Sequence, residues 1–89
     1  MLVEFDPVKR QATLDERGLD MAEAGLVFAG DVITVEDDRR DDGEPRYVTV
    51  GRLRGRIVFV AWTPRGDARR IIRMRKANDR ERAIYGGRV

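Results

Sequence analysis

The sequence predicts an α+β fold in which two helices precede an antiparallel β-sheet and a short helix follows it. Helix-start signals lie at Asp6 and at Asp20, in the first quarter of the chain. Four β-branched or apolar runs then follow one another across residues 32–77, separated by segments rich in turn residues. Strands joined by short turns pair antiparallel, whereas parallel pairing needs a long crossover. The order β-α-α-β-β-β-β-α therefore indicates a sheet meander in one domain, residues 1–89.

The helices are predicted from the residues that can cap them. A short strand over residues 2–5 leads into the first helix, residues 7–17, which has an aspartate before it and proline at its first position. Asp20 opens the second helix, and Glu23 three residues later completes a capping-box pattern. The same pattern recurs at residue 78 and predicts a short helix that ends near residue 85.

The sheet strands are expected over residues 32–36, 46–51, 57–62 and 68–77. The third of these runs is apolar throughout, which predicts a central strand that is covered on both faces. Trp62 at its end is expected to lie in the core. Glycine or proline in residues 52–56 and 63–67 predicts the hairpin turns that join the later strands.

The segment between the first two sheet strands, residues 37–45, is strongly charged. It contains the pairs Asp37-Asp38 and Asp41-Asp42, which two arginines separate. These pairs lack the spacing of a calcium-binding loop, so we expect an exposed loop without a metal site.

Composition excludes several kinds of chemistry. The chain contains no cysteine, no histidine and no serine, so thiolate zinc sites, thiol or serine nucleophiles and the commonest acid–base residue are absent. No metal or cofactor is therefore expected. No apolar run approaches the roughly 20 residues that span a membrane, and no signal peptide opens the chain. We expect a cytoplasmic protein that does not associate with membranes.

Charge is divided unequally along the chain. Residues 1–50 carry 13 Asp and Glu against 6 Lys and Arg, whereas residues 51–89 carry 12 Lys and Arg against 3 Asp and Glu. Most of the latter cations lie within residues 69–82. Such a stripe is typical of a surface that binds RNA or DNA. The alternative is a solvated charged face, or one that neutralises the acidic half of the protein.

The last strand concentrates these cations. Alternation of side chains predicts that Ile72 and Met74 face the core and that Arg73 and Arg75 face the opposite side, with Lys76 near the strand end. Clustered cations repel one another unless an anion lies among them, and guanidinium groups bind phosphate oxygens in bidentate fashion. The alternative is that these arginines pair with acidic residues of the final helix or of the loop.

Two residues outside the last strand extend this interpretation. Arg65, in the preceding turn, either adds a further cation or is an exposed turn arginine. Tyr85, in the final helix, either contacts a base or a phosphate or packs the helix onto the sheet.

Several short motifs occur in a specific order: Phe5-Asp6-Pro7-Val8-Lys9, Arg17-Gly18-Leu19, Glu23-Ala24 through Val27-Phe28, Glu44-x-Arg46-Tyr47 to Gly51, Thr63-x-Arg65-Gly66, Arg70-Ile71-Ile72-x-x-Arg75-Lys76-Ala77, and Arg80-Glu81-Arg82 with Tyr85. Together they resemble the BrnT family, the toxins of BrnT–BrnA type II toxin–antitoxin systems. The resemblance spans nearly the whole chain. It departs from the family where a helix-end histidine is Arg17 and where a strand serine is Arg73.

The resemblance implies a RelE-like fold and an endoribonuclease that needs no metal and inhibits translation. In such enzymes the 2′-hydroxyl of RNA attacks the adjacent phosphate, so the protein supplies cations, a base and an acid. The residues expected to carry catalysis are Arg65, Arg70, Arg75, Lys76, Glu81 and Tyr85. The arginines would stabilise the phosphate, Lys76 or Glu81 would be the base, and Tyr85 would orient substrate or donate a proton. RNA contacts are expected from Arg69, Arg73, Arg80 and Arg82.

The implied partners are an RNA substrate and a cognate BrnA-like, DNA-binding antitoxin of the ribbon-helix-helix type, with a toxin–antitoxin heterotetramer as one assembly. Two other functions remain open. One is a non-catalytic nucleic-acid-binding module. The other is an inactive toxin-fold partner of the antitoxin, which we consider because Arg17 replaces the helix-end histidine of the family.

Overall fold

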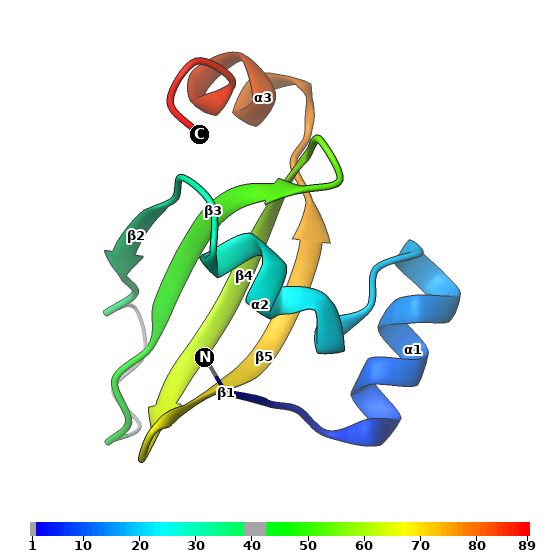
Figure 1. The fold of residues 1–89 in the computed structure, drawn as a ribbon, viewed down its shortest axis with the longest axis vertical. Helices are drawn as coiled ribbons and strands as arrows, with labels where there is room; N and C mark the ends of the chain where they lie inside the picture. Colours follow the sequence, from blue (N-terminus) through cyan, green and yellow to red (C-terminus); the bar gives the residue numbers. More distant parts are fainter. Residues whose placement is uncertain (1, 39–42) are drawn as a thin grey trace.

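A computed structural model describes residues 2–38 and 43–89 of the chain, and it contains one five-stranded sheet with the strand order β1-β5-β4-β3-β2 (Figure 1). The strands are β1 (Leu2–Glu4), β2 (Ile33–Glu36), β3 (Tyr47–Leu53), β4 (Arg56–Arg65) and β5 (Ala68–Lys76). The helices are α1 (Pro7–Arg17), the 3₁₀ turn η1 (Met21–Glu23), α2 (Ala24–Phe28) and α3 (Asp79–Tyr85). The predicted α+β fold is thus confirmed, with β4 at the centre of the sheet.

The sheet is mixed rather than wholly antiparallel. Strands β2 to β5 form the expected antiparallel meander, whereas β1 pairs in parallel with β5, with Leu2 opposite Ala68. Because β1 and β5 lie at opposite ends of the chain, their pairing has no local signal. It adds a second edge strand and brings the start of α1 beside β5.

Two of the three predicted helix starts form as expected. The Asp6 carboxylate accepts a hydrogen bond from the Val8 N–H at 2.8 Å, and Asn78 and Glu81 form a complete capping box at α3. At η1 the box does not form. Asp20 caps the Ala22 N–H, but Glu23 pairs with an arginine of the β3–β4 hairpin. The second helix is accordingly short, a 3₁₀ turn followed by α2.

The β3–β4 hairpin is tighter than residues 52–56 suggested. Only Arg54 and Gly55 lie outside the strands, and their φ angles are 50° and 80°. A two-residue turn in which both residues have positive φ has a backbone twist that matches the right-handed twist of the two strands it joins. The next predicted turn, residues 63–67, also shrinks because β4 continues through Pro64. Pro64 is tolerated here because the pairing between β3 and β4 ends at Tyr47 and Trp62, so no residue of β3 lies opposite Pro64 and needs its N–H.

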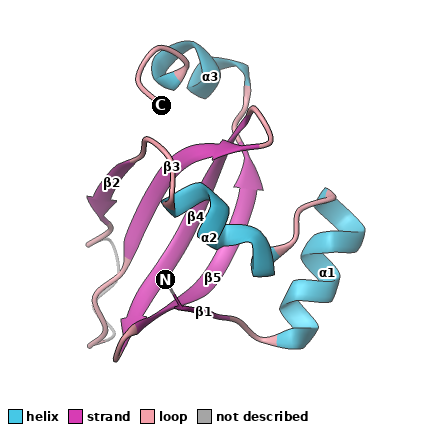
Figure 2. Ribbon diagram, viewed as in Figure 1, coloured by secondary structure: helices cyan, strands magenta, loops and turns pink. Residues whose placement is uncertain are grey.

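The main core lies between one face of the sheet and the segment η1–α2 (Figure 2). Its buried members are Leu19, Met21, Ala24, Val27, Phe28, Leu53, Val58, Val60, Trp62, Ile71 and Met74. Trp62 is in the core as predicted. Its indole N–H donates to the Thr49 hydroxyl at 2.8 Å, which satisfies its polar atom inside the core.

A register shift in β5 changes which side chains face this core. Ala61 pairs with Arg73 and Trp62 pairs with Ile71, which leaves Ile72 without a partner on β4. An extra residue of this kind is a β-bulge. Met74 faces the core as predicted, but the prediction for Ile72 was wrong. Ile71 takes the core position, with 2% exposure, and Ile72 is only partly buried.

The predicted loop over residues 37–45 is described only in part. Residues 39–42 lie outside the described residues, and with them the Asp41-Asp42 pair for which no metal site was expected. In the described ranges no helix is long and apolar enough to cross a membrane.

Candidate functional site

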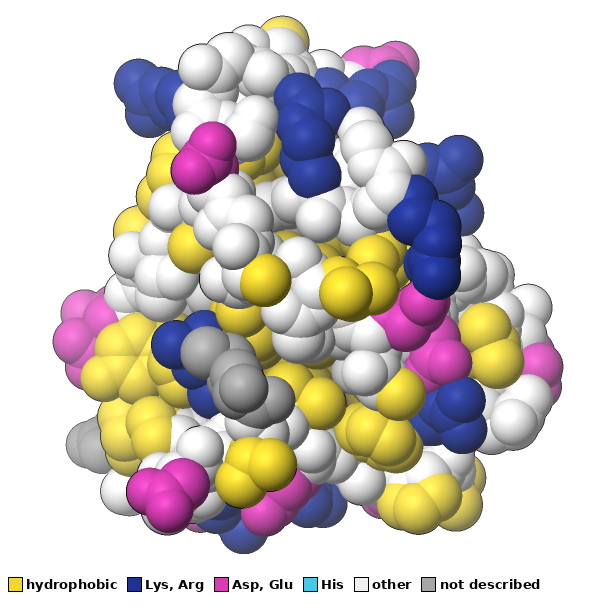
Figure 3. Space-filling view, in the orientation of Figure 1, with side chains coloured by type: hydrophobic (Ala, Val, Ile, Leu, Met, Phe, Trp, Pro, Cys, Tyr) yellow, Lys and Arg dark blue, Asp and Glu magenta, His cyan; other side chains and the backbone are white. Residues whose placement is uncertain are grey.

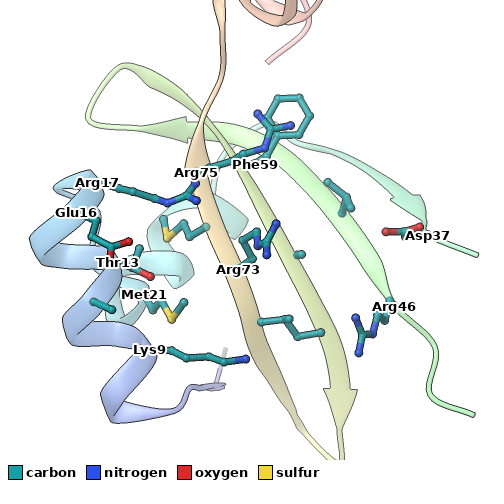
Figure 4. Close-up of a pocket in the computed structure, with 15 residues that line it drawn as sticks. Lys9, Thr13, Glu16, Arg17, Met21, Asp37, Arg46, Phe59, Arg73 and Arg75 are labelled. Carbon is teal, nitrogen blue, oxygen red and sulfur yellow. The ribbon is translucent and has the colours of Figure 1, made fainter. Parts of the chain in front are cut away.

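The sheet face opposite η1–α2 is open and forms a groove. A cavity of about 510 Å³ lies there between α1 and strands β3, β4 and β5 (Figure 4). The groove exists because α1 stands beside the sheet and buries none of its own residues. Phe59 and Ala61 of β4 are partly exposed and line it, so the prediction that β4 is covered on both faces was wrong.

Positive charge predominates in this groove. Its charged lining, within residues 2–38 and 43–89, consists of Lys9, Glu16, Arg17, Asp37, Arg46, Arg73 and Arg75. Five of these residues are cations and two are carboxylates. The floor is partly apolar, since Val48 and Ile72 lie beside Phe59 and Ala61. The groove therefore offers both cations and apolar surface to a bound molecule.

Helix α1 supplies the wall of the groove. Lys9, Thr13, Glu16 and Arg17 all line the cavity. Positions three and four apart lie on the same face of a helix, so these side chains point toward one side (Figure 4). That spacing was the signal in the sequence that could have identified them. Sequence reasoning assigned α1 to the fold alone.

Arg73 lies on the floor of the groove and points into it (Figure 4). Its side chain is exposed, as predicted for the face away from the core. Over the described part of the chain, Arg73, Lys9 and Arg17 form no ion pair. Their charges are therefore free to meet an anionic ligand.

Arg75 also lines the groove but is held by the final helix. Its two terminal nitrogens each donate to a carboxylate oxygen of Glu81 at 2.8 Å. The guanidinium lies 4.4 Å from the centre of the Phe59 ring. The structure thus shows, for Arg75, the alternative in which a strand arginine pairs with an acidic residue of the final helix.

Both carboxylate oxygens of Glu81 accept hydrogen bonds within the protein. Besides Arg75 it accepts a hydrogen bond from the Asn78 N–H at 2.9 Å. The hydrogen bonds from Arg75 and from Asn78 lower the pKa of the Glu81 carboxyl to about 2, against the partial burial that raises it. A carboxylate with so low a pKa is a weak proton acceptor, which disfavours the role of base expected for Glu81.

Lys76 lies on the other side of β5 from Arg75. It is paired with Val58, whose side chain belongs to the core on the η1–α2 side. Lys76 lines a second cavity, beside the β3–β4 hairpin and α3, and not the groove. The two candidate bases are therefore both outside the groove: Lys76 faces another cavity, and Glu81 is bound to Arg75.

Arg65 and Arg70 lie at the opposite end of the hairpin from Arg75. Arg65 pairs with Glu44 at 3.2 Å, and Arg70 pairs with Glu4 at 3.6 Å. Arg75 lies five positions after Arg70 along β5, which is roughly 17 Å of extended strand. The structure does not bring these expected phosphate ligands together with Arg75.

The remaining expected residues are also spread over the surface. Arg69 packs its guanidinium against Phe28 and Trp62, 4.3 and 4.5 Å from the ring centres, on the core side of the sheet. Arg82 pairs with Asp79, and Arg80 is exposed on α3. Of the ten residues that the sequence suggested, only Arg73 and Arg75 line the groove.

Tyr85 packs α3 onto the sheet. Its ring makes an edge-to-face contact with Phe59, with centroids 5.6 Å apart. It also packs against the small buried cluster of Val50, Ile57 and Ala77. The packing alternative considered for Tyr85 is therefore the one that the structure shows.

A family model described as the ribonuclease toxin, BrnT, of a type II toxin–antitoxin system matches residues 5–81. No curated protein matches the chain. The matched range contains every residue that lines the groove, from α1 to the end of β5.

Proposed function

The chain belongs to the BrnT family of ribonuclease toxins of type II toxin–antitoxin systems, and we therefore propose that the groove between α1 and strands β3 to β5 binds and cleaves RNA. The observation that carries this proposal is the convergence of three cations on the groove. Lys9 and Arg17 extend from the wall and Arg73 from the floor, and none of them has an ion pair in the described ranges.

The groove matches a nucleotide in chemistry and in size. Guanidinium and ammonium groups bind phosphate oxygens, and the partly apolar floor around Phe59 and Ile72 offers surface to a base. The cavity, at about 510 Å³, lies within the size range of small-molecule sites. We propose that one phosphodiester of a single RNA strand lies over Arg73, between the floor of the groove and the wall that α1 forms.

Cleavage in this groove needs no nucleophile from the protein. The 2′-oxygen of the RNA forms a bond to the adjacent phosphorus while the bond from phosphorus to the 5′-oxygen breaks. The products are a 2′,3′-cyclic phosphate and a free 5′-hydroxyl. The proton of the 2′-hydroxyl passes to a base, and the 5′-oxygen gains a proton. Arg73, Arg17 and Lys9 stabilise the extra negative charge that the phosphate carries in the transition state.

We place the proton acceptor at Glu16. Glu81 is bound to Arg75 and Lys76 faces another cavity, so neither carries this role in the arrangement described above. Glu16 lines the groove one residue before Arg17, and its carboxylate forms no ion pair over residues 2–38 and 43–89. A carboxylate beside the bound phosphodiester can accept the 2′-hydroxyl proton directly or through one water molecule.

A toxin of a type II system has a cognate antitoxin as its partner. We propose that this antitoxin is BrnA-like, with a ribbon-helix-helix DNA-binding part, and that it covers the cations of the groove. A dimeric DNA-binding part would then bring two toxin chains into one heterotetramer. The proposed place of action is the cytoplasm, and the proposed consequence of RNA cleavage is inhibition of translation.

The test is cleavage of labelled single-stranded RNA by the purified protein, with and without EDTA. We expect cleavage that EDTA does not abolish, with 2′,3′-cyclic phosphate and 5′-hydroxyl ends. Arg73→Ala should lower kcat about a hundredfold, as for the loss of one transition-state donor. Glu16→Gln should lower kcat to a similar degree while RNA binding persists.

The matched control is Arg88→Ala. Arg88 is exposed, forms no ion pair in the described chain and lies outside the groove, so this change removes the same charge elsewhere. RNA binding without cleavage would favour a non-catalytic module. Equal cleavage by wild type and by Arg73→Ala would show that the groove is not the site.

A further inference from the structure

A second cavity, of about 530 Å³, lies where the β3–β4 hairpin, the end of β5 and α3 meet. Five cations line it, Arg52, Arg54, Arg56, Lys76 and Arg82, and no described carboxylate does. Figure 3 shows dark blue side chains over α3 and the hairpin in the upper part of the molecule. The cavity is separate from the groove and shares no lining residue with it.

Part of this positive charge has no partner within the protein. Arg54 pairs with Glu23, and Arg82 pairs with Asp79. Arg56 and Lys76, by contrast, form no ion pair over the described residues, and both side chains are exposed. Cations gathered in one cavity repel one another, and a bound anion relieves that repulsion.

Arg52 is held by main-chain oxygens and not by an acidic side chain. Its guanidinium donates to the main-chain oxygens of Gly55 at 2.8 Å, Gly86 at 3.0 Å and Val89 at 3.1 Å. These bonds fix the side chain between the hairpin and the end of α3. The cavity thus has one cation, Arg52, that main-chain oxygens hold in place, and two exposed cations, Arg56 and Lys76, without an ion pair in the described ranges.

The end of β5 connects this cavity with the groove. Arg75 lines the groove and Lys76, the next residue, lines the second cavity. Consecutive strand residues point to opposite faces, so the two sites lie on the two sides of one strand end. An RNA strand that lies in the groove beside Arg75 is therefore one strand position away from Lys76 of the second cavity.

We propose that this second cavity binds the phosphate backbone of the same RNA strand, beyond the nucleotide that is cleaved. The proposal rests on the groove being the RNA site. The lining favours a phosphate backbone over an acidic protein segment. Its apolar members, Ile57 and Ala77, are buried beneath the cations with 3% and 5% exposure, so a protein partner would find little apolar surface there.

The test compares Arg56→Ala with Arg88→Ala, which removes the same charge outside both cavities. The probes are a single-stranded trinucleotide, which the groove alone accommodates, and a single-stranded dodecanucleotide. Arg56→Ala should weaken binding of the dodecanucleotide by about fivefold, with a much smaller effect on the trinucleotide. It should also reduce the slope of log K against log salt by about 0.7, the value for one phosphate contact on a single strand. Arg88→Ala should leave both affinities as in wild type.

Each result decides between the alternatives. If Arg56→Ala and Arg88→Ala have equal affinities for the dodecanucleotide, the second site is wrong even when wild type cleaves RNA in the groove. If wild type binds both probes but cleaves neither, the proposed cleavage is wrong. The second site is then still tested by comparing the affinities of Arg56→Ala and Arg88→Ala for the dodecanucleotide. If a polyglutamate peptide of equal charge binds wild type and loses affinity for Arg56→Ala, whereas the dodecanucleotide loses none, the cavity binds acidic protein segments and the proposal is overturned.

Discussion

The guanidinium of Arg75 donates to both carboxylate oxygens of Glu81 at 2.8 Å, and this pair joins the end of β5 to α3. Glu81 at the same time completes the capping box of α3 with Asn78. Behind the pair, Tyr85 packs on Phe59. Since α3 buries none of its own residues, these side-chain contacts hold it above the sheet together with the hydrogen bonds from Arg52 to the main chain of Gly86 and Val89.

Replacing Glu81 with glutamine should destabilise the protein by about 1 kcal/mol at neutral pH, because it removes a partly exposed bidentate ion pair. The glutamine amide oxygen can still accept from the Asn78 N–H, so the cap is retained. Urea unfolding measures the change as a shift of the midpoint. Asp79→Asn is the control, since it removes a carboxylate from the same helical turn whose partner, Arg82, is exposed. An equal effect of the two substitutions would contradict the special role of the pair.

The same ion pair predicts how stability depends on acid pH. The pKa of Glu81 is about 2 in the folded protein against an ordinary value of 4.5, because Arg75 and the Asn78 N–H bind its charged form. The stabilisation is therefore complete above pH 4.5 and is lost as pH falls toward 2. The difference in free energy of unfolding between wild type and Glu81→Gln should be constant above that window and shrink within it. A difference that persists unchanged at the acid end would contradict the assignment.

Lys9→Ala combined with Arg17→Ala should weaken RNA binding although both residues belong to the acidic half of the chain. The two side chains line the groove, and each phosphate contact on a single strand contributes about 0.7 to the salt slope, so the slope should fall by about 1.4. Binding measured at several salt concentrations gives the slope. Unfolding of the double variant should match wild type, since α1 buries no residue. An unchanged slope would place the RNA elsewhere.

The local parts of this fold were predictable, and the non-local parts were not. The cap at Asp6, the capping box at Asn78 and the strand order β2 to β5 follow from short-range signals, and all of them form. The bulge at Ile72 was not predictable because strict alternation gives no sign of one extra residue. The parallel pairing of β1 with β5 depends on residues more than 60 positions apart in the sequence.

The candidate site was only partly predictable for the same reason. A run of arginines indicates a basic surface, but it does not say which members pair with the protein's own acids. Arg70 and Arg75 are both paired in this way, with Glu4 and Glu81. Lys9 and Arg17 were not among the expected site residues because their proximity to Arg73 depends on how α1 stands beside the sheet. Only the assembled fold brings these three cations together.

Arg17→His should make RNA cleavage depend on pH near neutrality. The chain contains no histidine, so wild type has no side chain with an ordinary pKa near 6.5 and should show no inflection there. A histidine at position 17, the residue that the family resemblance leads us to expect there, would lie in the groove and titrate in that range. Rates measured across neutral pH should then show a new inflection in the variant alone. An inflection already present in wild type would indicate a contaminating nuclease.

Helix α1 buries none of its residues, so the choice of ligand along its groove face can change separately from the stability of the fold. Side chains on the groove face of this helix can be exchanged without opening a cavity in the core or leaving a buried charge unpaired, the two commonest sources of large losses in stability. The identity of residues 9, 13, 16 and 17 is thus open to change by natural selection while the sheet remains as it is. With RNA bound in the groove as we propose, descendants of this toxin can acquire new RNA preferences along α1 before any other part of the molecule has to adapt.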